Sequence, residues 1–224
     1  MPNLKTTALP HSCARYGVAL FAALAWTTTL AANLKVAVVD LHGRPLAEAV
    51  VYAIPADDSA AAAPVGLPRV VIDQIHRTFV PLVTVIRTGT EVRFPNSDNI
   101  LHSIYSFSPA KVFTAKLYSG KATSPVIFDK PGMVVLGCNI HDQMVAWVVV
   151  VDTPYFGKTG ADGAVELKEL PVGNYQLRTW YPAPAFEPRV DPIHVAADGA
   201  ELRISLDSAG SPLPTLLGTG TAAP

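Results

Sequence analysis

A short stretch of the sequence carries three side chains that can bind a soft metal ion. Cys138, His141 and Met144 stand three residues apart, and another histidine, His102, lies 36 residues upstream of the cysteine. Together they offer one thiolate, two imidazoles and one thioether. Thiolate and thioether are soft donors that hold Cu(I), and imidazole accepts Cu(I) or Cu(II). The set therefore predicts a type 1 copper centre, in which two histidines and one cysteine bind the ion and a methionine is the weak axial ligand.

The residues around these donors predict how they are positioned. One strand-like run ends near Leu136, the chain turns back through residues 139–143, and a second run begins near Met144. His102 stands at the start of a third run, Ser103 to Phe107. Because β-strands hold their ends in place, we expect a stiff centre that changes little when the ion changes valence.

The whole chain reads as an all-β protein. Its apolar runs are short, rich in β-branched and aromatic residues, and bounded by Gly, Pro, Asp or Asn. The clearest runs are Leu34 to Val39, Val50 to Ile54, Val83 to Ile86, Val145 to Val151 and Tyr175 to Trp180. The turn sequences Asp40 to Gly43, Thr88 to Thr90 and Ala161 to Gly163 are typical of hairpins, so we expect antiparallel pairing.

Composition excludes some classes of partner. The chain has 224 residues, of which 50% are apolar, and its 17 basic and 18 acidic residues give a formal charge of −1. This is enough apolar material for one large domain or two small ones. Without a basic excess we expect no nucleic-acid partner.

The N-terminus predicts export. Lys5 and Arg15 precede an uncharged run from Tyr16 to Ala32 that ends in small residues, which is typical of a signal peptide cleaved after residue 31 or 32. We expect a periplasmic mature chain with no membrane span. Only Cys138 remains after cleavage, so an internal disulfide is impossible. The thiol is then a buried inert group, an intermolecular link or a functional thiolate.

From Val70 to Asp152 the sequence resembles the cupredoxins, the plastocyanin and amicyanin group. The resemblance is carried by the spacing of Cys138, His141 and Met144, by Phe128-x-x-Pro131-Gly132, and by Pro95-Asn96-x-Asp98 before His102. More narrowly, Gly-Cys-Asn-Ile-His-Asp-x-Met at 137–144 and the pair Asp73-Gln74 resemble exported plastocyanin-like proteins labelled methylamine utilization proteins. The resemblance implies a Greek-key β-sandwich with one type 1 copper ion at His102, Cys138, His141 and Met144, and an electron exit at the edge of His141.

Two positions depart from the families. Ser103 stands where cupredoxins often have an asparagine that connects the ligand loops, which leaves this connection without its usual side chain. Trp180-Tyr181-Pro182 stands where the narrower family has Trp-His before proline. Asp98 and Asp142 could tune the centre or bind a partner, but exposed loop carboxylates usually do neither.

The flanks resemble a carboxypeptidase-regulatory-like sandwich in two parts. We therefore expect the cupredoxin domain to be inserted into a loop of this second, smaller sandwich; the alternative is a serial order of linker, cupredoxin domain and short C-terminal sandwich. The predicted division is a signal peptide over 1–32, the first part of the sandwich over 33–55, a linker over 56–68, the cupredoxin domain over 69–152, the second part of the sandwich over 153–207 and a flexible tail over 208–224.

The predicted function is electron transport and not enzymatic catalysis. One copper ion stores one electron, and the sequence shows no second cofactor site, so the partners are expected to be a transient protein donor and a transient protein acceptor. The alternative is a periplasmic copper storage or delivery protein, which would use the same donors. A thiol enzyme, a zinc site and a haem site fit the residues less well, because they need a substrate cleft, harder ligands or a second cysteine.

Overall fold

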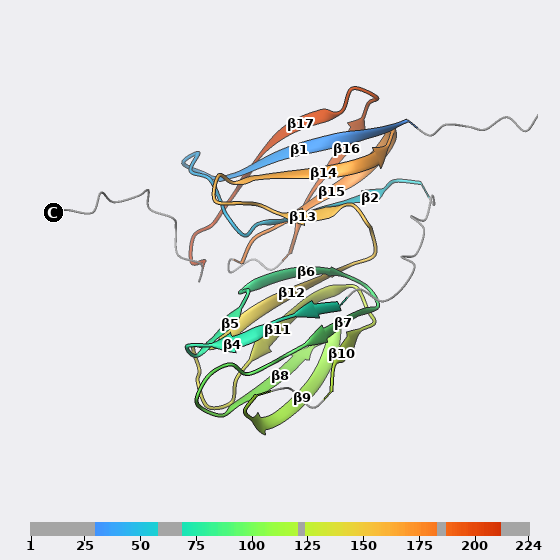
Figure 1. Ribbon diagram of the computed structural model, residues 1–224. Coiled ribbons are helices and arrows are strands. Elements are labelled where there is room, and N and C mark those ends of the chain that lie inside the picture. The colour runs from blue at the N-terminus through green and yellow to red at the C-terminus, as the bar shows by residue number, and fades with distance from the viewer. Residues whose placement is uncertain (1–29, 58–68, 121–123, 183–186, 212–224) are drawn as a thin grey trace, which may run out of the picture.

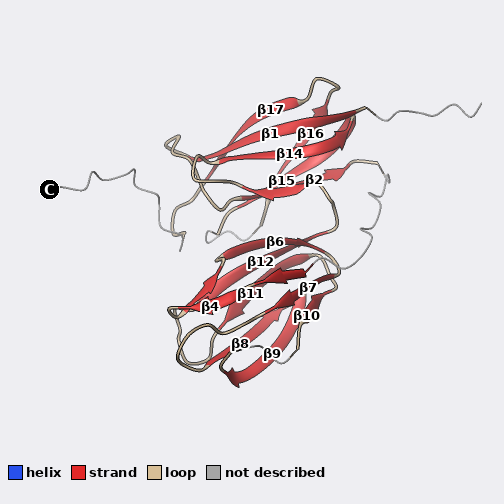
Figure 2. Ribbon diagram, viewed as in Figure 1, coloured by secondary structure: helices blue, strands red, loops and turns tan. Residues whose placement is uncertain are grey.

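The computed structural model describes residues 30–57, 69–120, 124–182 and 187–211. These residues form strands β1 to β17 and no helix (Figure 2), which confirms the prediction of an all-β chain. Within them there is accordingly no helix that is long and apolar enough to cross a bilayer. Most of the predicted signal peptide, linker and tail lies outside the described residues.

The two ends of the described chain build one sandwich, the upper one in Figure 1. Its sheets have the strand orders β14-β1-β17 and β13-β2-β15-β16. These strands are β1 (Ala31–Asp40), β2 (Val50–Pro55), β13 (Phe156–Lys158), β14 (Ala164–Pro171), β15 (Gly173–Trp180), β16 (Arg189–Val195) and β17 (Ala200–Leu206). Because β1 pairs with β14 and β17, and β2 pairs with β13 and β15, residues 69–152 lie between two parts of one sandwich.

The intervening residues form a second sandwich, the lower one in Figure 1. A five-stranded sheet of order β6-β12-β11-β8-β9 packs on a three-stranded sheet of order β10-β7-β3, and β4 pairs with β5 in a hairpin. The strands are β3 (Arg69–Val71), β4 (Asp73–Ile75), β5 (Thr78–Val80), β6 (Val83–Arg87), β7 (Thr90–Arg93), β8 (His102–Ser108), β9 (Lys111–Tyr118), β10 (Val126–Phe128), β11 (Gly132–Gly137) and β12 (Val145–Val151).

The expectation of purely antiparallel pairing is wrong at three places. β1 pairs with β17, β3 with β7, and β6 with β12 in parallel register. The turn Thr88 to Thr90 is also no hairpin, because it leads from β6 in the five-stranded sheet to β7 in the three-stranded sheet. A glycine-containing turn reverses the chain, but burial of the next apolar face decides which sheet the following strand joins.

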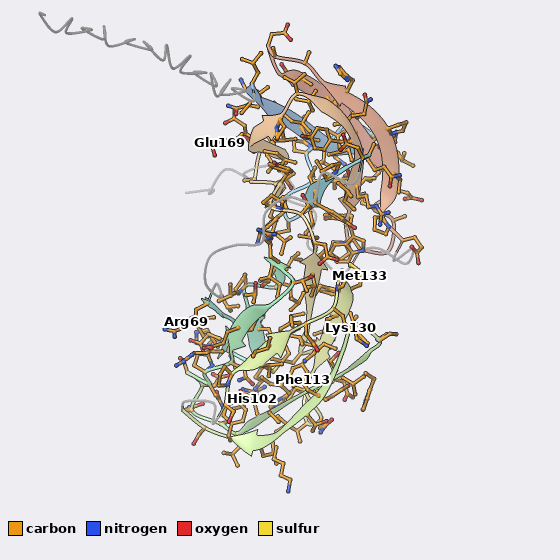
Figure 3. The ribbon with its side chains drawn as sticks, turned by 90° about the vertical axis from the view of Figure 1, so that its right-hand side faces the viewer. Arg69, His102, Phe113, Lys130, Met133 and Glu169 are labelled. Carbon is orange, nitrogen blue, oxygen red and sulfur yellow. The ribbon has the colours of Figure 1, made fainter. Side chains whose placement is uncertain are left out.

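Strand β12 is apolar throughout because both of its faces are buried. Ala146, Val148 and Val150 belong to the core of the second sandwich, whereas Trp147 and Val149 pack in the core shared with the first sandwich. The junction also contains Lys158, whose Nζ donates a hydrogen bond to the carbonyl oxygen of Val83 at 2.9 Å. The two sandwiches therefore meet mainly through apolar packing, to which this hydrogen bond is added. Met133 lies at their junction (Figure 3).

Candidate metal centre

The candidate centre forms where three strands of the second sandwich end or begin. β8 begins at His102, β11 ends just before Cys138, and β12 begins just after Met144. Gly137, the last residue of β11, pairs with Tyr105 of β8. A Cβ atom at position 137 would lie 2.6 Å from Cζ of Tyr105, so glycine leaves room for the Tyr105 ring to lie over this position. The pairing brings residues 138–144 beside the start of β8.

Three donor atoms converge at this place. Sγ of Cys138 lies 3.9 Å from Nδ1 of His102 and 3.8 Å from Nδ1 of His141. All three atoms lie within 4.8 Å of one another. A divalent ion bound at about 2.0 Å by nitrogen and about 2.3 Å by sulfur, with the donors about 120° apart, separates sulfur from nitrogen by about 3.7 Å. The spacing of these side chains therefore fits a single metal ion.

The fourth predicted donor, Met144, ends the same loop. Its N–H donates a hydrogen bond to the carbonyl oxygen of His141 at 2.9 Å, which closes the turn between the two residues. The Met144 side chain is buried in the same core cluster as Cys138. A soft thioether is thus buried in the same core as the thiol, away from water.

The cluster is closed to solvent on most sides. His102, Cys138 and Met144 are 0%, 3% and 1% exposed, whereas His141 is half-buried. Figure 3 shows His102 well away from the junction at which Met133 lies. His141 is consequently the donor residue through which the cluster reaches the surface.

The surroundings of Cys138 favour a thiolate. Burial raises the pKa of its thiol, but backbone N–H groups of Ile140 and Ser103 and the imidazoles of His141 and His102 outweigh this effect and lower the pKa to about 6. A group with this pKa is largely deprotonated at neutral pH. The thiolate is the form that binds metal ions.

Ser103 connects two of the ligand-bearing segments through its side-chain hydroxyl. Its Oγ accepts a hydrogen bond from the N–H of Asn139 at 3.1 Å and lies 3.9 Å from Sγ of Cys138. A serine hydroxyl thus joins the start of β8 to the loop after β11. Serine, although shorter than the asparagine expected at this position, reaches the backbone of that loop.

Asp98 lies beside the donor cluster, in contact with His102. One of its carboxylate oxygens, Oδ2, lies 2.8 Å from Nε2 of His102, the ring nitrogen opposite the one that faces Cys138. The N–H of Arg77 and the His102 side chain lower the pKa of Asp98 to about 2. Of the two interpretations of Asp98, the structure therefore favours a residue of the site over an ordinary exposed loop carboxylate. Its position four residues before His102, in the turn-forming sequence Asn-Ser-Asp-Asn, was the available signal.

The other residues considered from the sequence lie elsewhere. His42, His76 and His194 are exposed and stand outside the donor cluster, and Asp142 is exposed in the loop between His141 and Met144. Trp180 and Tyr181, which replace the Trp-His of the narrower family, are buried in the core of the first sandwich.

Comparisons with known proteins identify no family. No protein family and no curated protein matches this sequence. Among solved structures, a purple cupredoxin from Nitrosopumilus maritimus is similar at 23% identity over 38% of this chain and 99% of its own, with a TM-score of 0.33. A reduced amicyanin variant is similar at 19% identity over 45% of this chain and 99% of its own, with a TM-score of 0.35.

A copper-containing nitrite reductase from Thermus scotoductus SA-01 is similar at 24% identity over 52% of this chain and 28% of its own. Its TM-score of 0.36 is the highest of these three. At this level of likeness, the nature of the centre has to be inferred from the residues of this chain.

Proposed function

We propose that the protein is an exported carrier of single electrons with one type 1 copper ion bound by His102, Cys138, His141 and Met144. One observation carries this proposal: a buried thiol of lowered pKa lies 3.8 and 3.9 Å from the Nδ1 atoms of two histidines. The N-terminal sequence supports export, and the lone cysteine of the mature chain is available to a metal ion and not used in a disulfide.

The donor set favours copper over zinc. Zinc sites with cysteine and histidine are completed by a further hard or thiolate ligand, or by water. Here the group that ends the loop is the thioether of Met144, which suits Cu(I), and its burial excludes water from that side. The two imidazoles accept both oxidation states. Copper in this set supplies one-electron redox chemistry.

The protein residues limit rearrangement around the centre. His102 and Cys138 adjoin paired strands, and the hydrogen bond from Asn139 to Ser103 ties their loops together. Burial of both side chains removes the freedom that exposed loops would have. A site whose donors are already in place can change valence with little movement of the protein.

The half-buried His141 is the proposed port for electrons. Its neighbour Ile140 is 50% exposed, as is Leu101, the residue before His102. Exposed apolar side chains beside the two histidines suit short-lived docking of a donor or an acceptor protein. The closed environment of Cys138 and Met144 leaves no place for a substrate at the ion, which favours a carrier over an enzyme.

The direct test uses the mature protein purified from the periplasm. We expect one copper per chain, an intense sulfur-to-copper band in the visible spectrum and a narrow copper hyperfine splitting in EPR. Electron self-exchange and copper transfer to a chelator are then measured on the same sample. Fast exchange with slow release supports a carrier, whereas slow exchange with rapid release would assign the protein to copper storage or delivery. Absence of the visible band would overturn the proposed centre.

A further inference from the structure

We propose that Asp98 is a positioning residue that orients His102 for metal binding and biases the bound ion toward Cu(II). This inference rests on the proposed function and deepens it. It starts from the 2.8 Å contact between Oδ2 of Asp98 and Nε2 of His102.

The carboxylate of Asp98 is held from several sides. Its Oδ1 accepts a hydrogen bond from the N–H of His76 at 3.0 Å, and its Oδ2 accepts one from the N–H of Arg77 at 2.8 Å. The backbone N–H of Asp98 donates to Oδ1 of Asn96 at 3.0 Å, and Asn96 is itself buried. With its side chain only 11% exposed, Asp98 has little freedom to turn away from His102.

The β4–β5 turn contributes to this arrangement. His76 and Arg77 have φ angles of 51° and 58°, the left-handed conformation that both central residues of a two-residue type I′ hairpin turn adopt. Here both of their N–H groups point to one carboxylate, so the turn and Asp98 fix one another.

The consequence for His102 concerns its two ring nitrogens. A carboxylate only accepts hydrogen bonds, so Nε2 of His102 carries a proton and Nδ1 is the ring nitrogen left to bind a metal ion. That Nδ1 faces Sγ of Cys138 at 3.9 Å. Because His102 is fully buried, water does not compete with Asp98 for Nε2. The ring is thus held with Nδ1, the nitrogen that would bind a metal ion, toward the thiol.

The charge of Asp98 has a second effect. A carboxylate that accepts the far N–H of a ligating histidine makes the ligand more basic. Its negative charge interacts more strongly with Cu(II) than with Cu(I), since the ion differs by one positive charge and the site is shielded from water. We therefore expect Asp98 to lower the reduction potential of the centre.

The test compares Asp98→Asn with two matched variants of the full mature protein. In Asp98→Asn an NH2 group replaces one carboxylate oxygen. The single remaining oxygen cannot accept hydrogen bonds from His76, Arg77 and His102 together. Asp142→Asn removes an equal charge from the exposed loop beside His141. Asp73→Asn weakens the tether of β4 to the same loop, where Asp73 accepts from Oγ of Ser97 at 2.7 Å, without touching His102.

In Asp98→Asn, we expect the Cu(II) affinity to fall 10–100-fold, as is typical for loss of such a partner, and the Cu(I) affinity to fall less. Each tenfold difference between these two losses raises the reduction potential by about 59 mV. Both control variants should stay close to wild type in potential. An Asp98→Asn potential equal to that of Asp142→Asn would overturn the bias toward Cu(II).

Nitrogen NMR of the metal-free wild-type protein tests the orientation of His102 independently of copper and of any variant's folding. The expected result is a proton on Nε2 of His102. An Nε2 atom without a proton would overturn the positioning role. A wild-type protein that binds no copper would instead overturn the proposed function and the redox bias, while the NMR result would still decide how Asp98 orients His102.

Discussion

The hydroxyl of Ser103 accepts the N–H of Asn139 at 3.1 Å and thereby links the strand that begins with His102 to the loop that contains Cys138. Two ligand-bearing segments that are far apart in the sequence are held together by this one buried side chain. The strength of that link can be measured.

Replacing Ser103 with alanine leaves the N–H of Asn139 without this partner. We expect a loss of about 0.5–1.5 kcal/mol in the free energy of unfolding, because the exposed Asn139 can be solvated, and faster release of copper to a chelator. Ser106→Ala is the control, since Ser106 is also buried on β8 and its Oγ accepts from the N–H of Ser108 at 3.2 Å, remote from the ligand loops. Equal copper release from the two variants would contradict a role of Ser103 at the centre.

Cys138→Ser should abolish the sulfur-to-copper visible band. A serine hydroxyl is harder and far less acidic than the thiol, so it cannot replace the thiolate as a soft donor. The visible spectrum of the copper-loaded variant checks this, and circular dichroism checks that the sandwich is folded. A persistent band in a folded variant would exclude Cys138 as the ligand.

Met144→Leu should keep copper and raise the reduction potential. Leucine has a similar volume, so we expect a cost below about 1.5 kcal/mol in stability at this buried position. Removal of a weak axial sulfur donor disfavours Cu(II) more than Cu(I). Met133→Leu, at the junction of the sandwiches, is the control and should leave the potential unchanged. No change in Met144→Leu would remove Met144 from the axial position.

The metal-free protein should show a pH dependence that arises from Cys138. The thiol has a pKa of about 6 in the folded chain, against a reference value of 9.0. Between these values the unfolded chain binds a proton that the folded chain does not, so the free energy of unfolding rises with pH across this interval. The stabilisation is complete above pH 9 and is lost as the pH falls toward 6. Thiolate absorbance in the ultraviolet and urea unfolding at several pH values measure both effects. A folded-state midpoint near 9 would contradict the prediction.

Gly137→Ala should be destabilising because the new methyl group meets the ring of Tyr105. Overpacking of this kind costs about 1–3 kcal/mol, measured as a lower Tm or a lower denaturant midpoint. The double variant with Tyr105→Ala gives the methyl group room, so it should be less unstable than the sum of the two single changes. Simple additivity would show that Tyr105 is not the reason for glycine at this position.

The sequence predicted well what depends on local patterns. Short runs rich in β-branched residues favour strands, and the run Val145 to Val151 is a strand for that reason. The expected course of the chain from Leu136 to Met144 also agrees with a strand, a turn and a second strand. Parallel pairing of β6 with β12 could not be foreseen, because it depends on which apolar faces meet after the chain has crossed between sheets.

The contacts around the donors were harder to predict. Asp98 contacts His102 only because the β4–β5 turn presents the N–H groups of His76 and Arg77 to the same carboxylate. No residue pattern near His102 specifies that turn. Ser103 was recognised as a departure from an asparagine, but its hydrogen bond to Asn139 depends on the register that Gly137 and Tyr105 set between β11 and β8.

The double burial of β12 limits how the molecule can be dissected. Trp147, Val149 and Val151 pack against the first sandwich, so excising residues 69–152 would expose a contiguous apolar face on the isolated fragment. That fragment would self-associate even if its donor cluster remained intact. Any shortened version made for spectroscopy or for attachment to an electrode therefore needs polar substitutions along that face. Otherwise it must retain the first sandwich, which buries the face.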